Sequence, residues 1–410
     1  MSHKEPGLHL DAGSTVTALG ETQLPAPVDG GVRAHATVGD HRYASLGPLG
    51  AGGMGVVERV WDGDLMRELA VKRIRRELGH DPRMTAQFLW EARVTAYLDH
   101  PNIVPVHDLG AGPDGEPYFV MKRAAGEPLD RILERLRADA SARDAMPLPR
   151  RLRVLQQVAQ AIAFAHRRGV LHRDLKPSNV MVGDDGEVLV MDWGLAVPLP
   201  GPAGDRLRAV MPSGLEALSA GTPLYMSPEQ ARGEPLDERS DVFTLGVMLY
   251  ELASLARPFA GDSAREVTAR VAAGRARPLR DAWPEAPSPL VAVIERALRA
   301  APADRYPTVT ALASDLERVL DGQTPRAEPI SMMRRAARFY MSRDPAFAQL
   351  RIMDLDLMVA SGSFIGVAAC AAWNDLHGLW WMWAVLATIA GFPPTRRWLR
   401  LRRALAPPPR

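Results

Sequence analysis

An eight-residue stretch, His172-Arg173-Asp174-Leu175-Lys176-Pro177-Ser178-Asn179, carries three side chains that suit the transfer of a phosphoryl group. Asp174 could accept the proton of an attacking hydroxyl, Lys176 could neutralise phosphate charge, and Asn179 could bind a metal ion. Because an octapeptide can arise by chance, this interpretation depends on whether the partners it needs lie at workable distances along the chain.

A glycine-rich loop, Gly50-Ala51-Gly52-Gly53-Met54-Gly55, precedes this stretch. Glycines let a backbone approach phosphates closely and point its amides at them. Glycine-rich hairpins are common, so the loop alone is a weak indication. A dinucleotide-binding fold needs a helix directly after the glycines, whereas residues 56–61 have the composition of a strand, which argues against that fold.

Lys72 lies in a third run of strand composition, residues 68–74, with apolar neighbours on both sides. Most lysines on strands are simply solvated. An ammonium directed inward could reach the α- and β-phosphates of a nucleotide, but it would need a carboxylate to hold it. Glu91, on a helix predicted over 85–98, is the candidate for that partner; the alternative is an ordinary surface glutamate.

Asp192-Trp193-Gly194 follows the apolar run 188–191 and begins 13 residues after Asn179. An Asp at a strand end followed by Gly is more often a turn than a metal ligand. Here the spacing is that of a hairpin that would bring Asp192 and Asn179 together. Mg²⁺ prefers oxygen ligands and takes few of them from the protein, which suits this pair.

Two downstream segments place polar residues at predicted helix starts. The segment 221–229 ends in Ser227-Pro228-Glu229, which favours the first turn of a helix. Asp241 begins an otherwise apolar helix and could be an ordinary N-terminal charge. Taken alone, neither segment indicates chemistry.

The elements expected to position these residues form a small β-rich lobe followed by a larger helical one. Alternating and apolar runs predict strands over 43–49, 56–61, 68–74 and 118–121. Apolar residues spaced by three and four predict helices over 85–98, 150–168, 240–253, 288–299 and 309–320. Residues 1–40 lack a sustained apolar period and are expected to be a disordered tail.

In this order and at these spacings, the motifs resemble those of the eukaryotic-like Ser/Thr protein kinases of bacteria, over about residues 41–320. The resemblance implies an α+β, bilobal protein kinase fold that uses ATP and Mg²⁺ to phosphorylate protein substrates. It implies catalytic roles for Asp174, Lys176, Lys72 and Glu91, and Mg²⁺ binding by Asn179 and Asp192. The residues implied to contact ATP are Gly50, Gly52, Gly55, Val57, Ala70, Lys72, Met121, Ala124 and Met181.

The resemblance also implies two supporting contacts and a substrate preference. Glu229 would pair with Arg305, and Asp241 would brace the stretch 172–179, which is called the catalytic loop below. Lys176 and Thr222 indicate Ser/Thr rather than Tyr as the acceptor. Three positions depart from the family pattern without removing a catalytic residue: Trp193 for Phe, Ser227 for Ala and Lys122 for Glu.

Arg173, directly before Asp174, indicates regulation by phosphorylation, because an arginine there can pair with a phosphate on the activation segment, taken as residues 199–222. The hydroxyl side chains available in that segment predict autophosphorylation at one of three positions, Ser213, Ser219 or Thr222. Self-association for phosphorylation between two copies would follow from the same hypothesis.

Composition limits the location and the partners. The 410 residues have an ordinary globular composition, and the net charge of +2 gives no reason to expect nucleic-acid binding. A single cysteine, Cys370, excludes an intramolecular disulfide framework and fits a reducing compartment. The first residues lack the apolar core of a secretory signal. A cytoplasmic location is therefore expected for most of the chain.

The C-terminal part has a different character. Residues 357–373 and 378–394 are two uncharged runs of 17 residues, separated by a short turn and flanked by tryptophans and, further out, by arginines. This pattern predicts a transmembrane helical hairpin with both ends at the cytoplasmic face. The alternative is a soluble helical hairpin. We expect a tail over 1–40, a kinase domain over 41–320, a basic linker over 321–353 and a membrane anchor over 354–410.

The sequence therefore predicts an Mg-ATP-dependent Ser/Thr protein kinase that signals at the cytoplasmic membrane. A catalytically weak, kinase-like scaffold anchored to the membrane is the main alternative, but no catalytic motif is missing. A small-molecule kinase would lack the peptide-docking segment at 222–229 and its partner Arg305. A purely structural membrane adaptor would not account for the catalytic residues.

Overall fold

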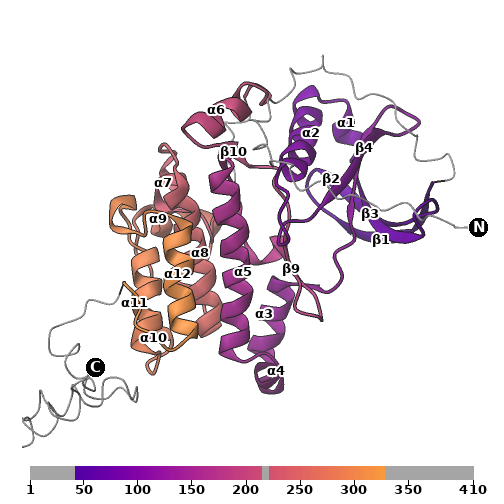
Figure 1. Ribbon diagram of the computed structural model, residues 1–410. Coiled ribbons are helices and arrows are strands. Elements are labelled where there is room, and N and C mark those ends of the chain that lie inside the picture. Colours follow the sequence, from indigo (N-terminus) through magenta and orange to yellow (C-terminus); the bar gives the residue numbers. More distant parts are fainter. Residues whose placement is uncertain (1–41, 215–220, 328–410) are drawn as a thin grey trace, which may run out of the picture. The chain divides into compact units, whose positions relative to one another are not determined.

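A computed structural model describes residues 42–214 and 221–327. A sheet and a helix form one lobe, and longer helices form the other (Figure 1). The sheet has the antiparallel order β1-β2-β3-β5-β4. Its strands are β1 (Tyr43–Ala51), β2 (Gly55–Asp62), β3 (Arg67–Ile74), β4 (Val106–Ala111) and β5 (Pro117–Lys122). The predicted small β-rich lobe is confirmed, and β4 was not predicted from the sequence.

The helix α2 (Pro82–Tyr97), which follows the one-turn α1 (Arg76–Gly79), packs on this sheet. Asp81 caps its N-terminus by accepting a hydrogen bond from the amide of Arg83 at 2.8 Å. Phe88 of α2 contacts Phe119 of β5, with ring centroids 5.2 Å apart. Since Glu91 lies one turn further along, this packing directs it toward β3.

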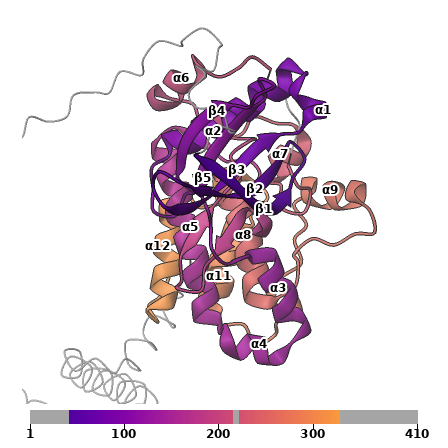
Figure 2. The same cartoon turned by 90° about the vertical axis from the view of Figure 1, so that its right-hand side faces the viewer.

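The second lobe is helical, and Figure 2 shows its long helices below the sheet. The helices predicted at 150–168, 240–253, 288–299 and 309–320 are found within two residues of those bounds. The helices are α3 (Leu129–Ala138), α4 (Ala140–Ala145), α5 (Leu148–Arg167), α6 (Pro202–Arg208), α7 (Pro228–Arg232), α8 (Glu238–Ser254), α9 (Ala264–Ala272), α10 (Leu279–Ala282), α11 (Ser288–Ala297) and α12 (Val309–Leu320).

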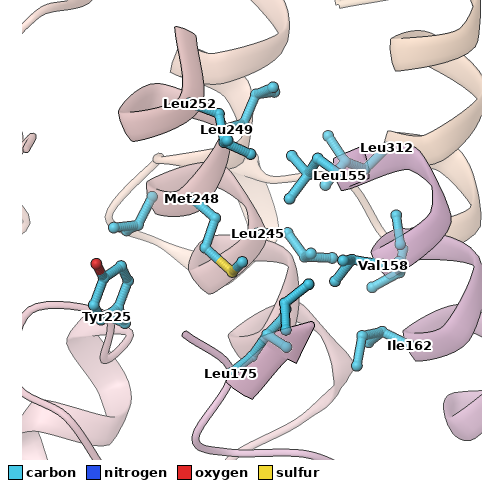
Figure 3. Packing of buried hydrophobic residues seen from close by; sticks show 14 of the residues in the cluster. Leu155, Val158, Ile162, Leu175, Tyr225, Leu245, Met248, Leu249, Leu252 and Leu312 are labelled. Carbon is cyan, nitrogen blue, oxygen red and sulfur yellow. The ribbon is translucent and has the colours of Figure 1, made fainter. Parts of the chain in front are cut away.

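The core of this lobe lies where α5, α8 and α12 meet. Leu155, Val158 and Ile162 of α5 face Leu245 and its neighbours on α8 (Figure 3). Leu175, from the middle of the catalytic loop, is inserted into the same cluster. Burying a leucine side chain is worth about 2 kcal/mol, so this contact anchors the loop between the residues proposed to act in catalysis.

Short strand pairs hold the two ends of the catalytic loop. β7 (Val170–Leu171), directly before it, pairs with β10 (Val197–Pro198). The 3₁₀ turn Pro177–Asn179 ends the loop and continues into β8 (Val180–Val182). β8 lies between β6 (Glu127–Pro128) and β9 (Val188–Val190), so β8 and β9 form the hairpin predicted to bring Asn179 and Asp192 together.

The first residues of the predicted linker lie against the helical lobe. Asp315 of α12 is buried and accepts hydrogen bonds from the amides of Arg326 and Ala327, at 2.7 and 2.8 Å. The hydroxyl of Tyr306 donates to the same carboxylate at 2.9 Å. Residues 321–327 are therefore held by the domain, and a polar residue within the helix α12 is what holds them.

The predicted tail at 1–40 and the predicted hairpin at 357–394 lie outside the described residues. Within residues 42–214 and 221–327, no helix is both long enough and apolar enough to cross a membrane.

Candidate active site

Lys72 of β3, which is partly buried, and Glu91 of α2, which is buried, form an ion pair with 2.5 Å between Nζ and Oε1. The sequence predicted this contact. Burial alone would lower the pKa of Lys72, but the carboxylates of Glu91 and Asp192 raise it above its usual value. Burial raises the pKa of Glu91, and Lys72 only partly opposes this. The second oxygen of Glu91 is buried and has no hydrogen-bond partner among the described residues.

Asp192 follows β9 and has a left-handed backbone, with φ 59°. A Cβ on Gly194 would lie 3.3 Å from Oε2 of Glu91 and 3.4 Å from Oδ1 of Asp192. Both carboxylates therefore approach the same glycine, where a larger residue would crowd them. Because these two carboxylates share the single ammonium of Lys72, the site carries excess negative charge, which favours a bound cation.

Asn179 supplies the other predicted metal ligand. Its amide nitrogen donates to the carbonyl of Asp174 at 2.9 Å, which fixes the amide and leaves its oxygen as the atom that could bind a metal. An amide oxygen and a carboxylate are ligands that Mg²⁺ prefers. The donor set of Asn179 and Asp192, together with the local negative charge, fits Mg²⁺.

Asp174 lies at the centre of a hydrogen-bonded triangle. Its Oδ1 accepts from both the amide and the hydroxyl of Thr222, at 2.9 and 3.1 Å. Its Oδ2 is 2.5 Å from Nζ of Lys176, which also donates to the hydroxyl of Thr222 at 3.1 Å. Thr222 lies 48 residues after Asp174 in the sequence. These hydrogen bonds therefore join two distant parts of the chain at the residue proposed as the base.

Asp241, at the start of α8, holds the backbone of the catalytic loop. It accepts hydrogen bonds from the amides of His172 and Arg173, at 3.0 and 3.3 Å. Burial alone would raise its pKa, but hydrogen bonds from His166 and the backbone lower it. His166 contacts Asp241 through Nε2 at 2.8 Å. This role of His166 was not predicted from the sequence, where it reads as one member of the apolar stripe of α5.

Glu229 and Arg305 form the predicted second ion pair, with two hydrogen bonds of 2.7 Å. The hydroxyl of Ser240 donates to Glu229 at 2.7 Å. Arg305 also donates to the carbonyls of Arg299, Ala300 and Arg239. Although burial alone would raise the pKa of Glu229, these bonds lower it. The pair therefore fixes helix α7 at the end of the segment 221–229.

Tyr225, within that segment, is held by a second network that the sequence did not indicate. Its hydroxyl donates to the buried Glu251 of α8 at 2.7 Å. Arg137 and Arg257 contact the other oxygen of Glu251. Glu251 stands within an apolar run of α8. Because a buried charge needs partners, a charged residue at such a position is the signal from which this network could have been predicted.

The glycine loop connects β1 and β2. Added Cβ atoms on Gly50 and Gly53 would meet nothing within 4 Å, so protein packing does not require glycine at these positions. At Gly55, in contrast, a Cβ would lie 2.6 Å from the carbonyl oxygen of Arg73. The open side of the loop fits a ligand that approaches the backbone, as a nucleotide phosphate would.

The other residues that the resemblance implies to contact ATP come from both lobes. Ala70 of β3 and Met121 of β5 are register partners and belong to one apolar cluster, against which Val57 of β2 packs. Met181 lies on β8 in the helical lobe. Ala124 is half-buried in the segment that joins β5 to β6.

The predicted regulatory hydroxyls differ in their surroundings. Ser213 is exposed. Thr222 is bonded to Asp174 and Lys176 as described above, so its hydroxyl is already engaged. Ser219 lies outside the described residues. The backbone at Arg173 is left-handed, with φ 70°.

Trp193 replaces the usual phenylalanine and is fully buried. Its ring lies 4.5 Å from that of His172, centroid to centroid. The indole therefore packs against the start of the catalytic loop.

Comparison with known proteins supports one family. The sequence model of the family described as 'Protein kinase domain' matches residues 43–316. The serine/threonine-protein kinase PknB of Mycolicibacterium smegmatis is 39% identical over 297 residues, which cover 70% of this chain and 44% of that protein. PknD of Protochlamydia amoebophila is 33% identical, covering 69% and 30%. A probable serine/threonine-protein kinase of Streptomyces coelicolor is 38% identical, covering 69% and 40%.

The aligned part of this chain spans less than half the length of these relatives. The family match over residues 43–316 nevertheless includes both lobes and every site residue described above. The chain therefore belongs to the protein kinase family, as a relative of the bacterial serine/threonine-protein kinases.

Proposed function

We propose that this chain phosphorylates serine and threonine side chains of proteins, with Mg·ATP as the phosphoryl donor. The observation that supports this most directly is the triangle of Asp174, Lys176 and Thr222 beside the Lys72–Glu91 pair. Such an arrangement has a base for a hydroxyl, cations for phosphate charge and two oxygen ligands for a metal.

Asp174 would accept the proton of the substrate hydroxyl. Thr222 orients its Oδ1, and Lys176 is placed where it would neutralise the charge of the transferred group. Lys72, held by Glu91, would bind the α- and β-phosphates. Bound Mg²⁺, with Asn179 and Asp192 as its ligands, would neutralise phosphate charge. Catalysis of this kind depends on positioning and charge stabilisation rather than on a covalent intermediate.

The test is transfer of labelled phosphate from ATP to the chain itself and to a generic protein substrate. We expect Asp174→Asn to reduce transfer about 10²–10⁴-fold. The matched control is Asp185→Asn, since Asp185 is an exposed aspartate in the β8–β9 turn. No labelling by the unchanged protein would refute the activity, and labelling by Asp174→Asn at the normal rate would refute the role of Asp174.

Autophosphorylation and membrane attachment are part of the same proposal. Ser213, which is exposed, and Ser219 are the favoured acceptors, because the hydroxyl of Thr222 is engaged with the catalytic loop. Phosphopeptide mapping of active protein tests this, and unmodified Ser213, Ser219 and Thr222 would refute it.

The apolar runs at 357–394 support a membrane anchor with the kinase domain at the cytoplasmic face. Partition of residues 1–330 and of the full chain between membrane and soluble fractions would decide between anchor and soluble hairpin.

A further inference from the structure

Helix α2 binds the segment after Asp192 through two side chains besides Glu91. The amide nitrogen of Gln87 donates to the carbonyl of Gly194 at 3.2 Å. The indole nitrogen of Trp90 donates to the carbonyl of Ala196 at 2.8 Å. Gln87, Trp90 and Glu91 are at positions i, i+3 and i+4, so they share one face of the helix.

Both donors are buried, with relative exposures of 5% for Gln87 and 2% for Trp90. Neither carbonyl could find water if its bond were broken without a larger movement. A buried polar group that loses its partner is strongly disfavoured. The two bonds therefore resist separation of α2 from residues 194–196.

The segment that α2 binds, residues 194–196, is short and is constrained on both sides. Asp192 is two residues before Gly194, and the amide of Ala196 donates to the carbonyl of Trp193 at 3.0 Å, which closes a turn. β10 follows directly and pairs with β7, the strand before the catalytic loop. Holding the carbonyls of Gly194 and Ala196 thus limits the positions that Asp192 can take.

We infer that Gln87 and Trp90 are positioning residues that hold Asp192 in register with the Lys72–Glu91 pair. Movement of α2 away from the sheet would break the Lys72–Glu91 contact and both carbonyl bonds together. The two proposed functional groups, Glu91 and Asp192, are thereby coupled through one helix face. This inference rests on the proposed function only in calling Asp192 a metal ligand.

The test uses Gln87→Met, Trp90→Phe and the double variant in the full chain. Methionine keeps the length of the side chain without the donor, and phenylalanine keeps an aromatic ring where Trp90 packs into the main apolar cluster. The controls are Gln160→Met, on an exposed residue of α5, and Trp61→Phe, on an exposed residue of β2.

The first readout is hydrogen exchange of the amides at 192–197, which needs neither nucleotide nor activity. We expect exchange to be about threefold faster in Gln87→Met and about tenfold faster in the double variant. Amides of α8 serve as the internal reference for global stability. Exchange at 192–197 that matches the controls, or that rises only in step with α8, would overturn the inference.

The second readout is phosphoryl transfer. We expect kcat of the double variant to fall about tenfold and the Mg²⁺ concentration for half-maximal activity to rise, while the KM for ATP stays within about twofold. A change confined to the KM for ATP would contradict a role in placing Asp192. If the unchanged protein transfers no phosphate, the proposed function fails, and the exchange result still decides the coupling.

Discussion

Two buried glutamates, Glu91 and Glu229, each face a cation, but their carboxylates accept different numbers of hydrogen bonds. Glu229 accepts from Arg305 through both oxygens and from Ser240 as well. Glu91 accepts from Lys72 through one oxygen, and its other oxygen is buried without a partner in the part of the chain that the structure describes. The pKa of Glu229 is lowered, whereas that of Glu91 is raised.

The difference distinguishes a pair that stabilises the fold from one that we propose acts on a ligand. A buried ion pair stabilises a fold when hydrogen bonds satisfy its remaining atoms, as they do at Glu229. At Glu91, the unbonded oxygen and the nearby Asp192 leave negative charge that a ligand cation could neutralise. Groups with incompletely satisfied charge are typical of sites that act on a ligand.

The largest expected effect is on stability, from Arg305→Met. Removing the guanidinium leaves Glu229 buried without its partner, so we expect the free energy of unfolding to fall by about 3–5 kcal/mol. Urea denaturation measures this. The control is Arg232→Met, which removes an exposed arginine paired with Glu234, where the loss should stay below about 1 kcal/mol. Equal losses in the two variants would show that burial of the pair does not matter.

Lys72→Met should impair phosphoryl transfer more than stability. We expect phosphoryl transfer to fall at least about 100-fold, which corresponds to about 2.7 kcal/mol of transition-state stabilisation. The loss of stability should be smaller than for Arg305→Met, because Glu91, whose pKa is already raised, can become neutral when its partner is removed. A destabilisation as large as that of Arg305→Met would make the Lys72–Glu91 pair a structural one too.

Both pairs could be predicted from the sequence, because each consists of two charged side chains in motifs of fixed order. Gln87 and Trp90 could not, since their partners are the carbonyls of Gly194 and Ala196, which every residue carries and only the fold brings close. The same holds for Asp315, whose partners are backbone amides. Motif spacing identifies side-chain partners, but it does not identify backbone ones.

Some missed elements were nevertheless predictable. Helix α3 buries Leu129, Ile132, Leu133 and Leu136, a spacing of three and four residues that indicates an amphipathic helix. β4 is harder, because it contains a glycine and polar residues and depends on pairing with β5. Strand formation there follows from tertiary contact rather than from local propensity.

The two glutamates should also respond to pH with opposite signs. The lowered pKa of Glu229 gives stabilisation that is present above its unfolded value, about 4.3, and is lost as pH falls through the folded value. The raised pKa of Glu91 gives a contribution that is present below about 4.3 and is lost as pH rises through the folded value. A tenfold difference between the acid dissociation constants of the folded and unfolded chain corresponds to about 1.4 kcal/mol of stability.

Urea midpoints at pH 3.5 and pH 7 measure these contributions in Glu229→Gln and Glu91→Gln. Relative to the unchanged protein, Glu229→Gln should gain less stability between the two pH values, and Glu91→Gln should gain more. If both variants changed in the same direction, the contrast between the two sites would be wrong.

The smallest expected effect concerns Trp193, whose indole nitrogen is another buried atom near the catalytic loop that lacks a hydrogen-bond partner among the described residues. Trp193→Phe removes this unsatisfied donor, which favours the variant, but it also removes apolar volume and leaves a small cavity, which disfavours it. Because the two effects oppose each other, we expect the free energy of unfolding to change by less than about 1 kcal/mol, as urea denaturation would show. Trp90→Phe is the matched comparison, since the nitrogen of Trp90 donates to Ala196, and there both effects should destabilise. A loss at Trp193 as large as the loss at Trp90 would mean that packing, and not hydrogen-bond satisfaction, decides stability around these two side chains.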